Sequence, residues 1–240
     1  MESSRYPTAL VWLIIVWSAS WLTVSCGEKA PQAPAPATQG SDTFTFFDIG
    51  KHSVFSSGLR NSLNRILGDD AIERRNLLDL EIVAKGFLKE HFPELDTVNQ
   101  GLNSPIGERV DHNTLKLMYR YARKKNLPFD YVEIVFSEYT QNPILINIRY
   151  RKDAAETLAS LEQKYGPPQT IVARQPDTKV QYWRKDNDVL LLAALPDQFG
   201  TPRYRIGIYY TENLRALVRA ESIDKTKGPT LETKSGKTPF

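Results

Sequence analysis

The 240-residue chain contains a single cysteine, Cys26. A lone cysteine excludes a disulfide within the chain, so the folded part depends on its hydrophobic core alone. A chain of this size can bury roughly 70% of its extended surface, which is enough to build such a core. The three histidines, His52, His91 and His112, lie far apart and do not form a zinc-binding pattern.

Short catalytic and nucleotide-binding motifs are also missing. The sequence has no G-x-S-x-G nucleophile elbow, no Walker loop, no G-x-G-x-x-G turn and no EF-hand calcium loop. The formal net charge of +3 is too small to indicate a polyanion-binding surface. We therefore predict a non-catalytic protein without a metal or a cofactor.

The first 25 residues have the build of a secretory signal peptide. One basic residue, Arg5, precedes an apolar run at residues 9–17, which continues through residue 24 with added serine and threonine. A membrane span needs ~20 apolar residues, and this run is too diluted to favour one.

The end of this segment, Leu22-Thr23-Val24-Ser25-Cys26, resembles the lipobox of bacterial lipoproteins, except that the family usually has leucine at position 23. The resemblance implies that Cys26 is lipidated, that the leader is cut before it and that the new N-terminus is acylated. Asp after the cysteine favours inner-membrane retention in this family, so Gly27 implies the outer membrane. The resemblance covers residues 1–26 and implies nothing about the folded domain.

A proline- and alanine-rich tether follows the cysteine at residues 26–40. Proline at near-alternating positions favours extended polyproline geometry of ~3.1 Å per residue, so the tether can hold a domain up to about 40 Å from the bilayer. We expect an α+β domain at residues 41–222 and a disordered tail at 223–240, where apolar residues are scarce.

The first part of the domain, residues 41–126, is predicted to be rich in helix. The expected elements are a strand at 43–47, a helix at 56–67, a second helix from Asp69 or Asp70 to residue 88 or beyond, ended or kinked at Pro93, and a loop at 102–110. Residues 114–122 fit either a strand, from their alternation, or a helix. The capping residues before this segment and the basic residues after it favour a helix, which is our prediction.

The second part, residues 127–222, is predicted to be rich in strand. Alternating apolar residues indicate a hairpin of 132–136 with 144–150, and a helix at 153–165 follows, opened by a capping box at Asp153 and stopped at Gly166. Further strands are expected at 170–174, 180–184, 189–194 and 204–210, before a short helix at 214–218. The fold class is therefore α+β: a helical N-terminal part, then a mostly antiparallel sheet in β-β-α-β-β-β-β order with a helix on one face. One domain and two subdomains, 41–126 and 127–222, both fit this pattern.

Basic residues gather at two places, Arg120 with 123–125 and Arg149 with 151–152, each with tyrosines interleaved. Such mixtures are typical of nucleic-acid surfaces, but an exported lipoprotein seldom meets nucleic acid, so we predict no nucleic-acid partner. We interpret both clusters as solvated ends of elements. If they bind a ligand, anionic lipid headgroups and envelope polymers are the nearest ones.

Two classes of function fit the sequence. The preferred one is a non-catalytic binding, adaptor or assembly protein of the bacterial cell envelope, membrane-bound through Cys26, facing the periplasm and docking an envelope protein. Its candidate partner surface comprises Trp183, Tyr204, Tyr209, Arg123, Lys124 and Lys125. The alternative is an envelope hydrolase or small-ligand-binding protein, with a site assembled from distant residues such as Asp111, His112 and Glu133.

Overall fold

The computed structural model describes residues 42–105, 108–120, 127–150, 154–172 and 178–227. Its strands are β1 (Ala71–Asn76), β2 (His112–Tyr119), β3 (Phe129–Ser137), β4 (Pro143–Tyr150), β5 (Gln169–Val172), β6 (Lys179–Lys185), β7 (Asp188–Pro196) and β8 (Pro202–Tyr209). Its helices are α1 (Ser57–Leu67), α2 (Phe87–His91), α3 (Pro93–Leu102), α4 (Ala155–Tyr165) and α5 (Thr211–Lys227).

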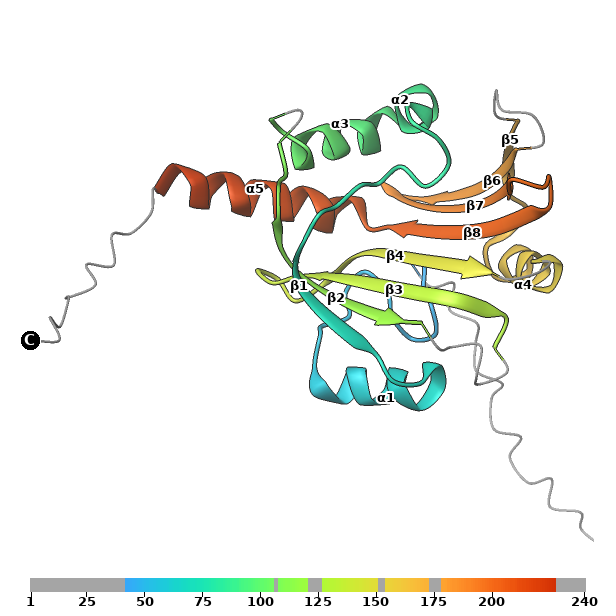
Figure 1. The fold of residues 1–240 in the computed structure, drawn as a ribbon, viewed down its shortest axis with the longest axis horizontal. Helices are drawn as coiled ribbons and strands as arrows, with labels where there is room; N and C mark the ends of the chain where they lie inside the picture. Colours follow the sequence, from blue (N-terminus) through green and yellow to red (C-terminus); the bar gives the residue numbers. More distant parts are fainter. Residues whose placement is uncertain (1–41, 106–107, 121–126, 151–153, 173–177, 228–240) are drawn as a thin grey trace, which may run out of the picture. The chain divides into compact units, whose positions relative to one another are not determined.

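The described strands form one antiparallel sheet in the order β1-β2-β3-β4-β8-β7-β6-β5 (Figure 1). Two four-stranded meanders, β1 to β4 and β5 to β8, meet where β8 pairs with β4. Helix α4 connects β4 to β5, which lies at the far edge of the sheet. The predicted α+β class and the β-β-α-β-β-β-β order are confirmed, and the part of the chain before residue 127 contributes β1 and β2 to the same sheet.

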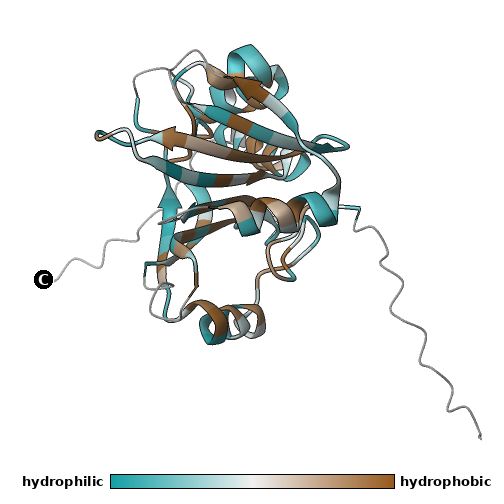
Figure 2. Ribbon diagram, turned by 90° about the vertical axis from the view of Figure 1, so that its right-hand side faces the viewer, coloured by the Kyte–Doolittle hydropathy of each residue, from teal (hydrophilic) through white to brown (hydrophobic). Residues whose placement is uncertain are grey.

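Side-chain alternation gives the sheet two buried faces. On β3, Val132, Ile134 and Phe136 face a core that also contains α1, α4 and residues 44–49; we call this the α1/α4 face. Val135 points to the opposite core, which is formed with α2, α3 and α5; we call this the α3/α5 face. Hydrophobic segments interrupted by polar ones are visible along the strands in Figure 2.

Helix α1 has the boundaries that its sequence predicts. The Ser56 hydroxyl accepts a hydrogen bond from the Leu59 N–H at 3.1 Å, and Gly68 ends the helix with a φ of 95°. Arg60 donates two hydrogen bonds, of 2.8 and 2.9 Å, to the carboxylate of Asp70. Burial alone would raise the pKa of Asp70, but the bonds from Arg60 and Asn64 outweigh it and lower the pKa below its usual value.

The predicted helix from residue 69 or 70 onward is wrong. Residues 71–76 form strand β1, and residues 77–86 cross the sheet without regular structure; we call them the strap. Gly86 has a φ of 85°, which interrupts a helix, and Pro93 occupies the first turn of α3 rather than ending a helix.

The prediction of a helix at 114–122 is also wrong, because strand β2 covers His112–Tyr119. Leu115, Leu117 and Tyr119 are buried on the α1/α4 face, and β2 pairs with β1 and β3 on its two sides. Cross-strand pairing and burial outweigh the capping pattern, whose basic part lies outside the described residues.

Residues 43–47 do not form the expected strand. Their backbone makes one isolated bridge, between Phe46 and Ile49, and is not part of the sheet. The buried side chains of Phe44, Phe46 and Ile49 close one end of the core, and the Tyr210 hydroxyl donates to the Phe44 carbonyl at 2.9 Å.

Helix α5 is longer than the predicted 214–218 and continues to Lys227, so residues 223–227 of the predicted disordered tail are helical. Side-chain contacts with the sheet region hold this extension. Glu221 contacts His112 at 2.7 Å, and the Tyr139 hydroxyl donates to Asp224 at 2.6 Å. Residues 228–240, like the leader, Cys26 and the tether, lie outside the described residues. No helix within the described ranges is long and apolar enough to span a bilayer.

Candidate ligand pocket beneath helix α4

Most aromatic residues of the predicted partner surface have structural roles instead. Trp183 and Tyr209 are 5% and 0% exposed, which contradicts a role in docking. The Trp183 indole donates to the Gly166 carbonyl at 2.7 Å, and the Tyr209 hydroxyl donates to the Leu80 carbonyl at 2.9 Å. Tyr204 is partly buried against the α1/α4 core. Arg123, Lys124, Lys125 and Cys26 lie outside the described residues.

The residues of the alternative hydrolase site do not come together. Asp111 pairs with Arg109 at 3.1 Å, whereas His112 is buried and contacts Glu221. Glu133 lies opposite Met118, six positions along β2 from His112 and therefore roughly 20 Å away. The three side chains belong to separate hydrogen-bond networks, so they do not form one catalytic site.

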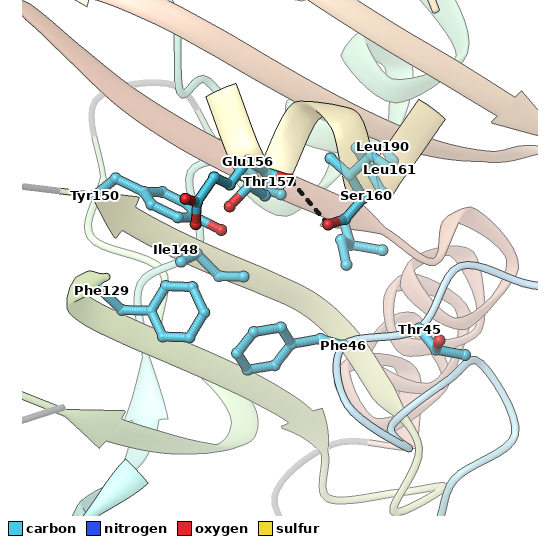
Figure 3. A pocket seen from close by; sticks show the side chains of 12 residues that line it. Thr45, Phe46, Phe129, Ile148, Tyr150, Glu156, Thr157, Ser160, Leu161 and Leu190 are labelled. Atoms are coloured by element: carbon cyan, nitrogen blue, oxygen red, sulfur yellow. Dashed lines mark hydrogen bonds between the residues drawn. The ribbon is translucent and has the colours of Figure 1, made fainter. Parts of the chain in front are cut away.

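An apolar pocket of about 290 Å³ lies between α4 and the α1/α4 face of the sheet. The sheet and residues 45–46 form its walls, and α4 covers it (Figure 3). Its lining residues are Thr45, Phe46, Phe129, Ile148, Tyr150, Glu156, Thr157, Ser160, Leu161, Leu190, Ile206 and Ile208.

The pocket exists because α4 packs incompletely on the sheet. None of its residues is fully buried, although Leu158, Leu161 and Tyr165 contact the core. Two contacts hold its C-terminal end. There the Tyr165 ring meets Phe44 edge-on at 5.1 Å, and the Tyr165 hydroxyl accepts a hydrogen bond from the Thr45 N–H at 2.9 Å.

Aromatic rings form one wall of the pocket. Phe129 packs edge-on against Phe46 and Tyr150, with ring centroids 5.6 and 5.1 Å apart. Burial raises the pKa of Tyr150 to about 12, and a hydrogen bond with the Thr157 side chain partly opposes the rise. The Tyr150 hydroxyl is therefore neutral at physiological pH and can act as a hydrogen-bond donor.

Helix α4 adds three polar residues to the lining, Glu156, Thr157 and Ser160 (Figure 3). Ser160 donates to the Glu156 carbonyl at 2.8 Å, within the helix. The Glu156 carboxylate is exposed and makes no hydrogen bond or ion pair with the described residues. It is therefore available to accept a hydrogen bond or a cation from a bound partner.

The lining residues of the pocket include one candidate nucleophile, Ser160. Ser160 has no histidine or lysine among the other lining residues to act as its base. Within the described ranges, no group of three or more His, Cys, Asp or Glu side chains is placed to hold a metal ion.

The sequence predicted two of the elements that border the pocket, but not the pocket itself. Alternation correctly predicted a strand with Ile148 and Tyr150 on one face, and the helix at 153–165 was expected to cover one face of the sheet. Phe46 and Phe129 were not recognised as lining residues. The sequence signal for a pocket here is the weak apolar stripe of α4. Only three of its 11 residues pack partly against the core, which is too few to fill the space beneath the helix.

No protein-family model, curated protein or solved structure is significantly similar to this chain.

Proposed function

We propose that this chain is a lipid-anchored, non-catalytic adaptor of the bacterial cell envelope that captures an apolar side chain of a protein partner in the α4 pocket. The observation that carries the proposal is the aromatic-walled pocket with a polar rim on α4. Interface hot spots are commonly large apolar side chains inserted into such pockets.

The size of the pocket favours a side chain over a whole ligand. Small-molecule sites enclose roughly 300–1,000 Å³. At about 290 Å³, this pocket lies at the lower limit of that range and suits one aromatic or branched aliphatic group. The free Glu156 carboxylate and the Tyr150 hydroxyl can then bind the backbone or a basic residue of the same partner segment.

The leader supports the location in the envelope. The lipobox-like residues 22–26 would attach Cys26 to the membrane, and Gly27 favours the outer membrane over the inner one. Thr45 and Phe46, which line the pocket, follow the 26–40 tether closely in the chain. The pocket would thus face the periplasm within about 40 Å of the bilayer.

Photo-crosslinking in intact cells tests this proposal. A photoreactive amino acid replaces exposed Glu156 at the pocket rim, and a control probe replaces exposed Gln100 on α3. We expect one discrete protein adduct from position 156 and none from position 100. The adduct should disappear with Cys26→Ala, which removes the proposed anchor.

A blocking variant connects the adduct to the pocket. Ser160 is exposed and lines the pocket, so Ser160→Trp can fill it without disturbing the core, whereas Ser160→Ala leaves it open. The adduct from position 156 should be lost with tryptophan and kept with alanine. An adduct that survives Ser160→Trp, or no adduct from a correctly lipidated protein, would contradict the proposal.

A further inference from the structure

The turn between β7 and β8 holds a phenylalanine ring in solvent. Phe199 in this turn is 82% exposed, and Val172, the last residue of β5, is 84% exposed. No other large apolar side chain that the structure describes exceeds 57%. Antiparallel pairing places the end of β5, the start of β6 and the β7–β8 turn at the same end of the sheet (Figure 1). The two most exposed apolar side chains of the described chain therefore lie at one end of the sheet.

Hydrogen bonds fix the backbone of this turn. One carboxylate oxygen of Asp197 accepts from the N–H groups of Phe199 and Thr201, at 2.8 and 2.9 Å. The Asp197 N–H donates to the Thr201 carbonyl at 2.9 Å, and the Gly200 N–H donates to the Asp197 carbonyl at 3.0 Å. Gly200 has a φ of 79°, which glycine adopts without strain. The ring is thus presented by an ordered turn, so burying it against a partner does not require the loop to be ordered first.

The charges beside the turn are mainly positive. Lys179 begins β6 opposite Val172, and Arg203 is the second residue of β8; both are exposed. Asp197 is the acidic residue of the turn. Its second carboxylate oxygen pairs with Arg203 at 3.4 Å. Lys179 makes no hydrogen bond or ion pair with the described residues, so its charge is available to an external anion.

This combination fits a bilayer surface better than a protein. A stable protein interface buries about 800 Å² on each partner, and one ring on a narrow turn cannot supply that area. A bilayer needs no shaped counter-surface. Its interface accepts apolar and aromatic side chains singly, and its anionic headgroups attract nearby lysine and arginine.

We propose that the β7–β8 turn docks the domain on a phospholipid bilayer. Phe199 and Val172 enter the interface, and Lys179 and Arg203 lie beside anionic headgroups. The inference rests on the proposed lipid anchor, which would keep the domain within about 40 Å of the bilayer. Strand β8 leads from this turn to Ile206 in the α4 pocket, so docking would hold that pocket near the membrane surface.

Fluorescence quenching in nanodiscs tests the docking. The full-length protein is reconstituted in discs of phosphatidylethanolamine and phosphatidylglycerol that carry quenching doxyl groups on some acyl chains. An environment-sensitive fluorescent amino acid replaces exposed Gln198, beside Phe199. The control probe replaces Val54, which is 57% exposed and lies near the β3–β4 turn at the opposite end of the sheet. We expect a blue-shifted, quenched emission from position 198 and neither effect from position 54.

Substitutions connect the quenching at position 198 to the turn. Phe199→Ser should weaken docking about tenfold or more, because it removes the main apolar contact. Val54→Ser is the matched control and should leave the quenching unchanged. Lys179→Gln should weaken docking about fivefold on discs with phosphatidylglycerol and have little effect on discs without it. All three side chains are exposed, so the variants should fold, which thermal denaturation verifies.

Equal quenching at positions 198 and 54, or quenching that survives Phe199→Ser, would overturn the proposal. Retention of the protein on the discs during gel filtration reports on the anchor separately. Retained protein with an unquenched probe at 198 contradicts docking alone, whereas protein that is not retained contradicts both the anchor and the docking. An unquenched probe at 198 combined with a discrete photo-crosslinked adduct from position 199 in cells would assign the turn to a protein partner instead.

Discussion

Two substitutions of the buried Asp188 carboxylate measure different contributions to folding stability. Asp188→Ala removes both its hydrogen bond and its charge, whereas Asp188→Asn removes only the charge. The Asp188 side chain is 2% exposed and accepts a hydrogen bond of 2.9 Å from the Thr211 N–H, at the start of α5. The Lys51 ammonium lies 3.6 Å from its second oxygen. The carboxylate thus joins β7 to the first turn of α5.

Asp188→Ala leaves the buried N–H of Thr211 without an acceptor. Loss of a hydrogen bond to a charged group costs about 1.5–3 kcal/mol of folding free energy. For a domain of this size that corresponds to a fall in Tm of about 3–12 °C. Asp188→Asn keeps an oxygen acceptor and removes only the charge, so its cost should be smaller.

The pH dependence of folding stability further distinguishes the hydrogen bond of Asp188 from its charge. Burial raises the pKa of Asp188 above its ordinary value of 3.8, and the attraction of Lys51 and the Thr211 N–H only partly oppose this. The folded protein therefore holds the Asp188 proton more tightly than the unfolded chain does. This contribution to stability is lost as the pH rises from about 4 through the folded-state pKa. Asp188→Asn imitates the protonated form and should gain stability relative to wild type over that range.

Chemical denaturation at several pH values between about 3.5 and 8 measures these differences. Asp69→Asn serves as control, because Asp69 is exposed and makes no hydrogen bond or ion pair with the described residues. We compare the free energy of unfolding of wild type with that of Asp188→Asn at each pH. If this difference is constant with pH, or shifts in favour of wild type as the pH rises, the role of burial is refuted. Asp188→Ala within about 0.5 kcal/mol of wild type would refute the role of the hydrogen bond.

Two further substitutions test how the strap and α5 are held. Gly207→Ala places a Cβ atom 2.9 Å from the Ile82 side chain. The overpacking should destabilise the fold by about 1–3 kcal/mol and speed amide hydrogen exchange in residues 78–86. An unchanged free energy of unfolding would contradict the close approach. Glu221→Ala removes the contact to buried His112 and should cost about 1–3 kcal/mol while exposing the amides of residues 219–227 to exchange. Unchanged protection there would mean that α5 extends without this contact.

The strand-rich part of the fold could be predicted because its signals are local. Val132, Ile134 and Phe136 alternate along β3, and Gly166 ends α4 with a φ of 83°. Both patterns can be recognised within a few residues, without knowledge of what packs against them.

The errors fall where distant contacts decide the structure. Five of the six residues of β1 are exposed, so this edge strand shows no alternation and is defined by its pairing with β2. In the strap, Leu80 is buried by packing on the sheet, and its spacing with Leu77, Phe87 and Leu88 imitates a helical stripe, although Leu77 is exposed. The last turns of α5 depend on Glu221 and on contacts more than 80 residues away in the chain.

The same locality explains what the sequence could reveal of the α4 pocket and of the β4–β8 pairing. Arg149 belongs to a basic cluster noted in the sequence, but its neighbour Arg205 is 56 residues later, and only the pairing of β4 with β8 brings them together. Likewise Phe46 and Phe129 meet through the packing of residues 44–49 on β3. Both juxtapositions depend on strand pairing and on the packing of distant segments. The pattern of a single sequence does not give either of these.

The α4 pocket uses the β4–β8 pairing, where the two meanders join. Ile148 lies opposite Ile206 and lines the α4 pocket. The next residue of β4, Arg149, lies opposite the preceding residue of β8, Arg205, on the other face. Substituting the isoleucines would disturb the core and the pocket at once, whereas the Ser160 side chain lies outside the core. Loss of crosslinking with Ser160→Trp therefore reports on the pocket itself and not on a change in the core.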